Sequence, residues 1–240
     1  MRTKPLFSVT RWTPSWRLPE FGTLVGFLIF SGLAFGFVQI ADEMREGETK
    51  AFDDRLLLFF RDPLDTAKPI GPGWVQEMMI DFTALGGAPV LTLIASLVVI
   101  YLLVTKRYGN AALVTAAMIG GAILTRALKF GFARPRPEIV DHLVNVSSAS
   151  FPSGHATASA ITYLTLGALL ARTESRKAVR AYVFCVAGAL TLTIGVSRVY
   201  LGVHYPTDVL AGWAVGAAWA LLCWTVARML RPRDNETTEG

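Results

Sequence analysis

The chain has 240 residues, of which 52% are hydrophobic and only 17% are charged. An average soluble domain carries about 25% charged residues. This low charge and a mean hydropathy of +0.45 exclude a disordered chain and argue against an ordinary soluble enzyme. Two cysteines are too few for a disulfide scaffold. The composition is typical of a protein in a lipid bilayer, where a net charge of +5 indicates basic cytoplasmic loops rather than nucleic-acid binding.

Six segments are long and apolar enough to cross a membrane as helices, which requires about 20 mostly apolar residues. The first, 22–41, contains no charged residue. Its apolar run exceeds the core of a cleaved signal peptide, so we expect a permanent helix. The others are residues 87–104, 109–128, 154–171, 181–196 and 207–227. The sequence therefore predicts an all-α, integral-membrane bundle of six transmembrane helices that forms one domain over residues 1–240.

The distribution of Lys and Arg predicts the orientation. With the N-terminus inside, 13 of the 23 Lys and Arg residues fall on the inner side, among them Arg2, Lys4, Arg11 and Arg17. Because cytoplasmic loops are enriched in these residues, we expect both termini in the cytoplasm.

The long segment between the first two spans, 42–86, contains two recognisable stretches. Lys50–Arg61 is short and amphipathic. It could lie flat on the outer leaflet or pack against the helix bundle. Residues 63–73 are rich in Pro and Gly and predict turns.

Three polar clusters lie at the ends of predicted spans, and all three fall on the outer side. They occupy residues 129–137, 152–155 and 197–208. Polar residues that gather in a membrane protein are functional candidates. The three clusters therefore predict one site at the outer face of the membrane.

The cations of these clusters indicate a phosphate site. Lys129, Arg136 and Arg198 would repel one another unless they held a dianion, and Lys and Arg are the side chains that bind phosphate. Ser153 and Gly154 stand at the start of a predicted helix. Helix N-termini direct free backbone N–H groups at anions, and glycine lets the backbone approach closely.

The remaining polar residues indicate a reaction. His204 and Asp208 are four residues apart, and an Asp within reach of an imidazole orients it and stabilises its charged form. His204 could then attack phosphorus to form a phospho-histidine. His155 could protonate the leaving alkoxide and later activate water. We expect no metal, because the sequence contains no carboxylate cluster to hold one.

The spacing K-x6-RP, PSGH and SR-x5-H-x3-D over residues 129–208 resembles that of the type 2 phosphatidic acid phosphatase superfamily. The six predicted spans are similar to its integral-membrane lipid phosphatases. The resemblance implies metal-independent catalysis without a cofactor, with His204 as nucleophile, Asp208 as its orienting partner and His155 as general acid. It implies that the phosphate is bound by Lys129, Arg136, Ser153, Gly154 and Arg198.

The function expected from this resemblance is hydrolysis of a membrane lipid phosphate at the outer leaflet. Undecaprenyl pyrophosphate is the first choice, because that lipid is released on the outer face. Phosphatidylglycerophosphate, phosphatidate and lipid A phosphates are alternatives, as is phosphate transfer between lipids. A lipid transporter or scramblase with a decayed site is the alternative from another class, but the intact motifs argue against it. The bilayer and the lipid substrate are the expected partners, and nucleic acid is not.

Other polar residues near the clusters have no place in the motifs. We interpret Arg134 as a rim charge or a phosphate helper. Arg126 is expected at the edge of the third span, and His142 in a solvated loop. Glu138 and Asp141 could contact a second phosphate or a headgroup.

Overall fold

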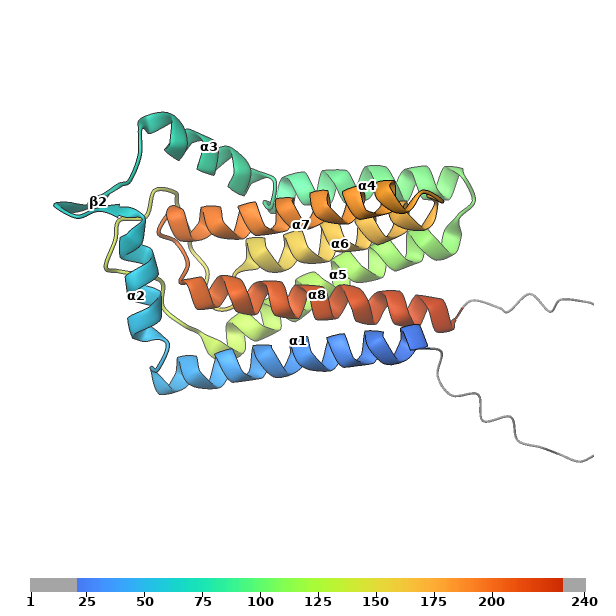
Figure 1. The fold of residues 1–240 in the computed structure, drawn as a ribbon, viewed down its shortest axis with the longest axis horizontal. Helices are drawn as coiled ribbons and strands as arrows, with labels where there is room; N and C mark the ends of the chain where they lie inside the picture. Colours follow the sequence, from blue (N-terminus) through green and yellow to red (C-terminus); the bar gives the residue numbers. More distant parts are fainter. Residues whose placement is uncertain (1–20, 231–240) are drawn as a thin grey trace, which may run out of the picture.

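The computed structural model describes residues 21–230, which form eight helices and one two-stranded antiparallel ribbon (Figure 1). The elements are α1 (Phe21–Glu46), α2 (Lys50–Phe59), β1 (Arg61–Asp62), β2 (Asp65–Pro69), α3 (Gly73–Ala84), α4 (Ala88–Val104), α5 (Tyr108–Phe132), α6 (Gly154–Arg172), α7 (Lys177–Tyr200) and α8 (Pro206–Met229). The N-terminal cations Arg2, Lys4, Arg11 and Arg17 lie outside the described residues.

Each predicted span is a helix, but the prediction of six transmembrane helices is confirmed only in part. Within residues 21–230, four helices are long and apolar enough to cross a membrane, namely α1, α5, α7 and α8. The pair α3 and α4, bent by 44° at a short break, makes a fifth candidate. The predicted span 154–171 is α6, whose many Ser, Thr and Gly residues reduce its hydropathy. The all-α membrane bundle is confirmed, and the number six is not.

Helix α6 lies at the centre of the bundle and packs against α4, α5, α7 and α8 (Figure 1). Its buried side chains are mostly small or hydroxyl-bearing. Three of the hydroxyls, those of Thr157, Ser159 and Thr162, donate to carbonyls within the chain segment of the helix, as where Thr157 Oγ1 donates to the Ser153 carbonyl at 2.9 Å. Small side chains let neighbouring backbones approach closely, so a helix of modest hydropathy can occupy the middle of the bundle.

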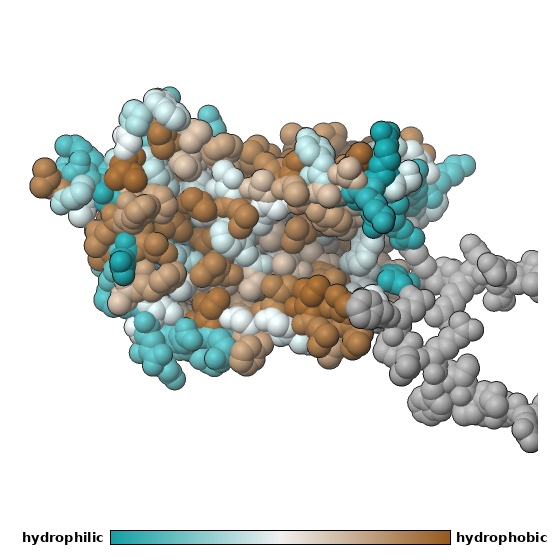
Figure 2. Space-filling view, in the orientation of Figure 1, coloured by the Kyte–Doolittle hydropathy of each residue, from teal (hydrophilic) through white to brown (hydrophobic). Residues whose placement is uncertain are grey.

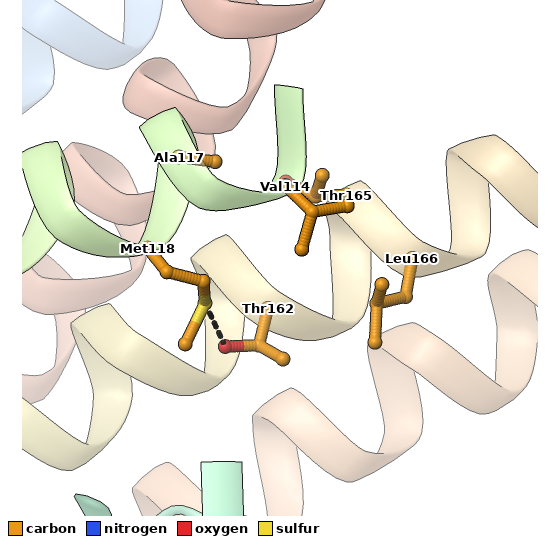
Figure 3. A pocket seen from close by; sticks show the side chains of 6 residues that line it. All are labelled: Val114, Ala117, Met118, Thr162, Thr165 and Leu166. Carbon is orange, nitrogen blue, oxygen red and sulfur yellow. Dashed lines mark hydrogen bonds between the residues drawn. The ribbon is translucent and has the colours of Figure 1, made fainter. Parts of the chain in front are cut away.

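The interface between α5 and α6 is apolar and closely filled (Figure 3). Thr162 Oγ1 donates to the Ala158 carbonyl at 2.8 Å and contacts Met118 Sδ at 3.1 Å. The side chains around this contact are Val114, Ala117, Thr165 and Leu166. This packing fixes α5, which carries Lys129, against α6, which carries His155.

The outer surface of the bundle is suited to lipid. Hydrophobic side chains cover the flanks of the long helices, and hydrophilic ones gather at the two ends (Figure 2). Exposed large apolar residues include Phe27, Phe35, Leu93 and Ile123. The start of α1, the end of α8 and the turns after α4 and α6 lie at one end, and α2 and the ribbon lie at the other (Figure 1).

The amphipathic stretch Lys50–Arg61 forms α2 and packs against α7 and α8 rather than lying separately on a leaflet. Asp53 and Leu57 on this helix are buried. Arg61, which is 2% exposed, donates to the Tyr200 carbonyl at 2.8 Å and to the Asp141 carbonyl at 3.3 Å. This end cap, comprising α2, the ribbon and α3, is thereby fixed to the turn between α7 and α8.

We expect Gly216→Ala to lower the melting temperature of the protein in detergent. A Cβ at Gly216 would lie 2.7 Å from the Thr157 carbonyl oxygen and 2.8 Å from Ala160 Cβ, and forced overpacking costs about 1–3 kcal/mol. Gly188→Ala in α7 is the matched control, since no atom of a described residue lies within 4 Å of the added carbon. Equal effects of the two substitutions on thermal unfolding would contradict this account of α6–α8 packing.

Candidate active site

His204 and Asp208 form a buried pair at the start of α8. His204 lies in the turn between α7 and α8 and is 1% exposed. Its Nδ1 lies 3.4 Å from Asp208 Oδ2. Pro206 at the first helical position fixes the start of α8, and Asp208 Oδ2 accepts the Tyr205 N–H at 2.9 Å. The same carboxylate therefore caps the helix and faces the imidazole.

Asp208 has further partners that motif spacing did not reveal. Ser150 Oγ donates to Asp208 Oδ2 and lies 3.3 Å from His204 Nδ1. Arg134 Nη1 donates to the other carboxylate oxygen, Oδ1, at 2.7 Å. Because Asp208 accepts from the Nδ1 side, the Nε2 lone pair of His204 is left for another group.

Burial sets the protonation state of His204. The removal of the imidazole from water, and the nearby positive charges of Arg136 and Arg198, lower the pKa of His204 to about 3, against the opposing effect of Asp208. The ordinary value is about 6.5. His204 is therefore neutral at physiological pH, and a neutral imidazole is the form that acts as a nucleophile.

Arg136 lies beside the free nitrogen of His204. Its Nη1 is 3.3 Å from His204 Nε2 and donates to the Val203 carbonyl. Its Nε donates to the Ser148 carbonyl at 2.8 Å. The loop before α6 thus holds a guanidinium next to the atom that would attack.

Lys129 and Arg198 complete, with Arg136, what we call the cation cluster. Lys129 at the end of α5 donates to the Ala149 carbonyl, and Arg198 donates to Thr83 Oγ1 on α3 at 2.9 Å. The three side chains are close enough for their charges to act on one another. Arg198 Nε is buried without a hydrogen-bond partner among the described residues, as expected of a donor that awaits a ligand.

The start of α6 faces the cation cluster. Ser153 is its N-cap residue, and its N–H donates to the Asp208 carbonyl at 2.9 Å. Ser153 Oγ is buried without a partner among the described residues, and Lys129 Cε would lie 3.6 Å from a Cβ added to Gly154. His155, in the first turn, lies within electrostatic range of His204 and the cluster.

The geometry brings the three predicted polar clusters to one end of the bundle around His204. A family model described as the PAP2 superfamily matches residues 110–232. The chain belongs to the PAP2 superfamily. The resemblance drawn from the motifs is confirmed.

Two curated relatives are named phosphatases. The chain is 31% identical to phosphatidylglycerophosphatase B of Bacillus subtilis over 148 residues, which cover 60% of this chain and 70% of that protein. It is 32% identical to the undecaprenyl-diphosphatase BcrC of the same organism over 119 residues, which cover 48% of this chain and 56% of that protein. The chain is accordingly a membrane lipid phosphatase of the PAP2 type.

A solved structure supports the fold over most of the chain. The transmembrane PAP2-type phosphatidylglycerolphosphate phosphatase of Bacillus subtilis superposes with a TM-score of 0.74 at 25% identity. The match covers 84% of this chain and 97% of that one. The similarity therefore extends beyond the motif region to the helices that precede it.

One polar residue outside the motifs, Arg134, lies away from its expected place. Arg134 is not a rim charge: its side chain is 11% exposed and ion-paired with Asp53 and Asp208. His142 is an exposed loop residue, as expected, and contacts the Pro137 carbonyl at 2.7 Å. The remaining residues of this kind, Arg126, Glu138 and Asp141, are also exposed.

Neither Asp53 nor Thr83 was a sequence candidate. Both precede the motif region by more than 40 residues, and no local pattern marks them. The only signal for Asp53 was a carboxylate within an amphipathic stretch, and the sequence does not show that this carboxylate is buried.

Within residues 21–230, no group of three or more His, Cys, Asp or Glu side chains is placed to hold a metal ion.

We expect the imidazole of His204 to remain neutral in a titration from pH 8 to pH 5.5. Its lowered pKa places protonation below this window, whereas free imidazole side chains protonate near 6.5. Nuclear magnetic resonance of protein labelled at histidine would follow the ring, with His204→Gln to assign the signal. A His204 signal that titrates near pH 6.5 would contradict the inferred burial.

Proposed function

We propose that the protein hydrolyses a lipid phosphate through a phospho-histidine on His204, without a metal ion. The observation that carries the proposal is the placement of His204, with Nδ1 against Asp208 and Nε2 beside Arg136. The nucleophilic nitrogen thus faces the side on which the cation cluster can hold phosphate.

In the first step, His204 Nε2 attacks phosphorus and the P–O bond to the lipid breaks. Asp208 stabilises the positive charge that develops on the imidazole. His155, neutral in the free site, takes up a proton as the phosphate dianion binds and supplies it to the leaving alkoxide. The cation cluster and the N–H groups at the start of α6 stabilise the negative charge on the phosphoryl oxygens.

In the second step, His155 takes a proton from water and the resulting hydroxide attacks phosphorus. The P–N bond to His204 breaks, and inorganic phosphate leaves. Since the cation cluster supplies the charge that a metal would otherwise provide, activity is expected to persist in the presence of a chelator.

The charge balance of the site favours a single terminal phosphate. Its described charged groups are the cation cluster, Arg134 and the two carboxylates of Asp53 and Asp208. They leave an excess of two positive charges when the histidines are neutral. A phosphate monoester carries about two negative charges at pH 7, which matches this excess, and a diphosphate carries more.

We therefore propose phosphatidylglycerophosphate as substrate ahead of undecaprenyl pyrophosphate, which the sequence alone placed first. The longer match to phosphatidylglycerophosphatase B than to BcrC supports this order. Phosphatidate, lipid A phosphates and phosphate transfer to a second lipid remain the enzymatic alternatives.

Purified protein in detergent should release phosphate from phosphatidylglycerophosphate faster than from undecaprenyl pyrophosphate or phosphatidate, with EDTA present. His204→Ala should abolish turnover, and a rapid quench with ³²P-labelled substrate should trap an acid-labile, base-stable phosphoenzyme in the wild type only. Activity that EDTA abolishes would refute the metal-free mechanism. Lipid binding or transport lost in His204→Ala, with no hydrolysis of any lipid by the wild type, would instead favour the transporter.

We also propose that the end with the site faces the outside of a bacterial inner membrane. The turns after α4 and α6 lie at the opposite end (Figure 1), and they carry the basic residues Lys106, Arg107, Arg172 and Arg176. Basic loops face the cytoplasm, so the site is expected to take its substrate from the outer leaflet.

Cysteine labelling tests this orientation. In a chain whose two native cysteines are replaced, Leu64→Cys at the tip of the ribbon, where Leu64 is 98% exposed, should react with a membrane-impermeant maleimide in spheroplasts. Ser175→Cys in the turn after α6 is the matched control and should react only after lysis. The reverse pattern would overturn the orientation.

A further inference from the structure

A second ion pair lies behind the catalytic pair. Arg134 Nη1 donates to Asp208 Oδ1 at 2.7 Å, and Arg134 Nη2 donates to Asp53 Oδ2 at 2.8 Å. The Arg134 side chain is 11% exposed, and the two carboxylates are fully buried. The planar guanidinium thus joins α2 to the start of α8, and a lysine could not make both contacts in this way.

Asp53 also accepts two hydrogen bonds from the first turn of α8. Its Oδ1 accepts the Thr207 N–H at 3.0 Å, and its Oδ2 accepts Thr207 Oγ1 at 2.7 Å. Thr207 lies in the first turn of α8, where backbone N–H groups have no partner within the helix. A carboxylate from the end cap therefore completes the N-terminus of the helix that carries Asp208.

The contacts at Asp208 divide between its two oxygens. Oδ1 is held by Arg134, and Oδ2 accepts from Ser150 and Tyr205 and faces His204. With Oδ1 held, the carboxylate cannot rotate about its Cβ–Cγ bond without breaking a charged hydrogen bond. The hold on Oδ1 therefore fixes the direction in which Oδ2 meets the imidazole.

The net charge that Asp208 and its ion-pair partners present to His204 matters as much as their geometry. Arg134 alone would neutralise Asp208 and weaken its attraction for a positively charged imidazole. Asp53 restores one net negative charge to the trio of Asp53, Arg134 and Asp208. Burial disfavours the charged guanidinium, but Asp208 and Asp53 more than compensate and raise the pKa of Arg134, so the guanidinium remains charged.

We propose that Asp53 and Arg134 are positioning residues that orient Asp208 and preserve its negative charge towards His204. Neither is a ligand of the phosphate. The inference rests on the proposed role of His204 as the nucleophile. The inference makes the end cap part of the site, because Asp53 on α2 contacts Arg134, which in turn pairs with Asp208.

Three variants test the proposal: Asp53→Asn, Arg134→Gln and the double variant that combines them. Each single variant should lose about 10²-fold in kcat with little change in KM, because Arg134→Gln loses the orientation of Asp208 and Asp53→Asn loses its net negative charge, whereas neither loses substrate binding. Asp54→Asn is the matched control, since the neighbouring carboxylate pairs with the exposed Lys50 at 2.9 Å and surface pairs contribute little.

The pH dependence of kcat/KM separates a charge effect from a packing effect. Arg134→Gln leaves two carboxylates uncompensated, which raises the pKa of His204 and moves the acid limb to higher pH by about one unit. Asp53→Asn leaves Arg134 balanced by Asp208 alone and moves the limb to lower pH. The other groups around His204, namely Lys129, Arg136, His155 and Arg198, are the same in both variants.

The double variant separates positioning from stability. Breaking a buried ion pair destabilises a protein, whereas replacing both partners is often tolerated. We expect the double variant to regain part of the melting temperature lost in Arg134→Gln, since one buried carboxylate rather than two then lacks its partner, while kcat stays low. Recovery of kcat together with the melting temperature, or acid limbs that do not move apart in the single variants, would overturn the proposal. So would a raised KM with unchanged kcat in Arg134→Gln, which would make Arg134 a phosphate ligand.

Arg134→Lys and His204→Ala complete the set of variants. If the single variants do not fold, Arg134→Lys and the double variant replace them, and Arg134→Lys should retain more kcat than the double variant does. Equal kcat in these two would overturn the proposal. His204→Ala separates failure of the proposed function from failure of this inference. Activity in His204→Ala would refute the role of His204 as nucleophile. An inactive His204→Ala variant, together with fully active Asp53 and Arg134 variants, would refute the positioning role alone.

Discussion

The structure depends on one buried carboxylate, Asp208, which serves the fold and, in the proposed mechanism, the chemistry. It caps α8 through the Tyr205 N–H, and it accepts charged or hydroxyl donors from Arg134 and Ser150. It also faces His204. A buried carboxylate is stable only when its oxygens are well supplied with donors. The loop before α6, the turn after α7 and the end cap therefore converge where they can supply those donors.

The close packing of α6 and α8 brings the start of α6, the proposed phosphate-binding end of that helix, to this carboxylate. The Ser153 N–H donates to the Asp208 carbonyl at 2.9 Å, and a Cβ at Gly212 would lie 2.9 Å from the Ser153 carbonyl oxygen. Only glycine at position 212 permits this approach. The small residues of α6 thus account both for its place in the middle of the bundle and for the position of His155 relative to His204.

The parts of the molecule that the sequence predicted are those with a local or periodic signal. Long apolar runs predicted the helices to within a few residues at most ends, and the motif spacing predicted that His155, Arg198 and His204 would meet at one end. The helix α3 was not predicted, because it occupies part of a long extramembrane segment and continues into α4 through a bend. The short ribbon has no apolar alternation to mark it.

The partners of Asp208 lacked such a signal. Ser150 is one Ser among several in its loop, and Asp53 belongs to a stretch whose amphipathic pattern allowed two positions, on the leaflet or on the bundle. Which position it takes depends on tertiary contacts with α8. Arg134 was the most misleading, because its neighbour Arg136 faces the histidine while Arg134 is paired with carboxylates. Two arginines separated by one proline thus have opposite electrostatic surroundings.

That difference between the two arginines explains how the site can be rich in cations and still hold a negatively charged Asp208 beside His204. The proposed mechanism needs positive charge on the side of His204 where phosphate would bind, and negative charge on the Asp208 side. If Arg134 were not balanced by Asp53, the Asp208 side would carry no net charge, and the imidazole would lose much of the attraction that stabilises its positive form. The buried carboxylate on α2 keeps the two sides opposite in sign, so the field across His204 points from the cation cluster towards Asp208. A dianionic phosphate placed on the cation cluster would then neutralise the remaining excess charge at the membrane edge.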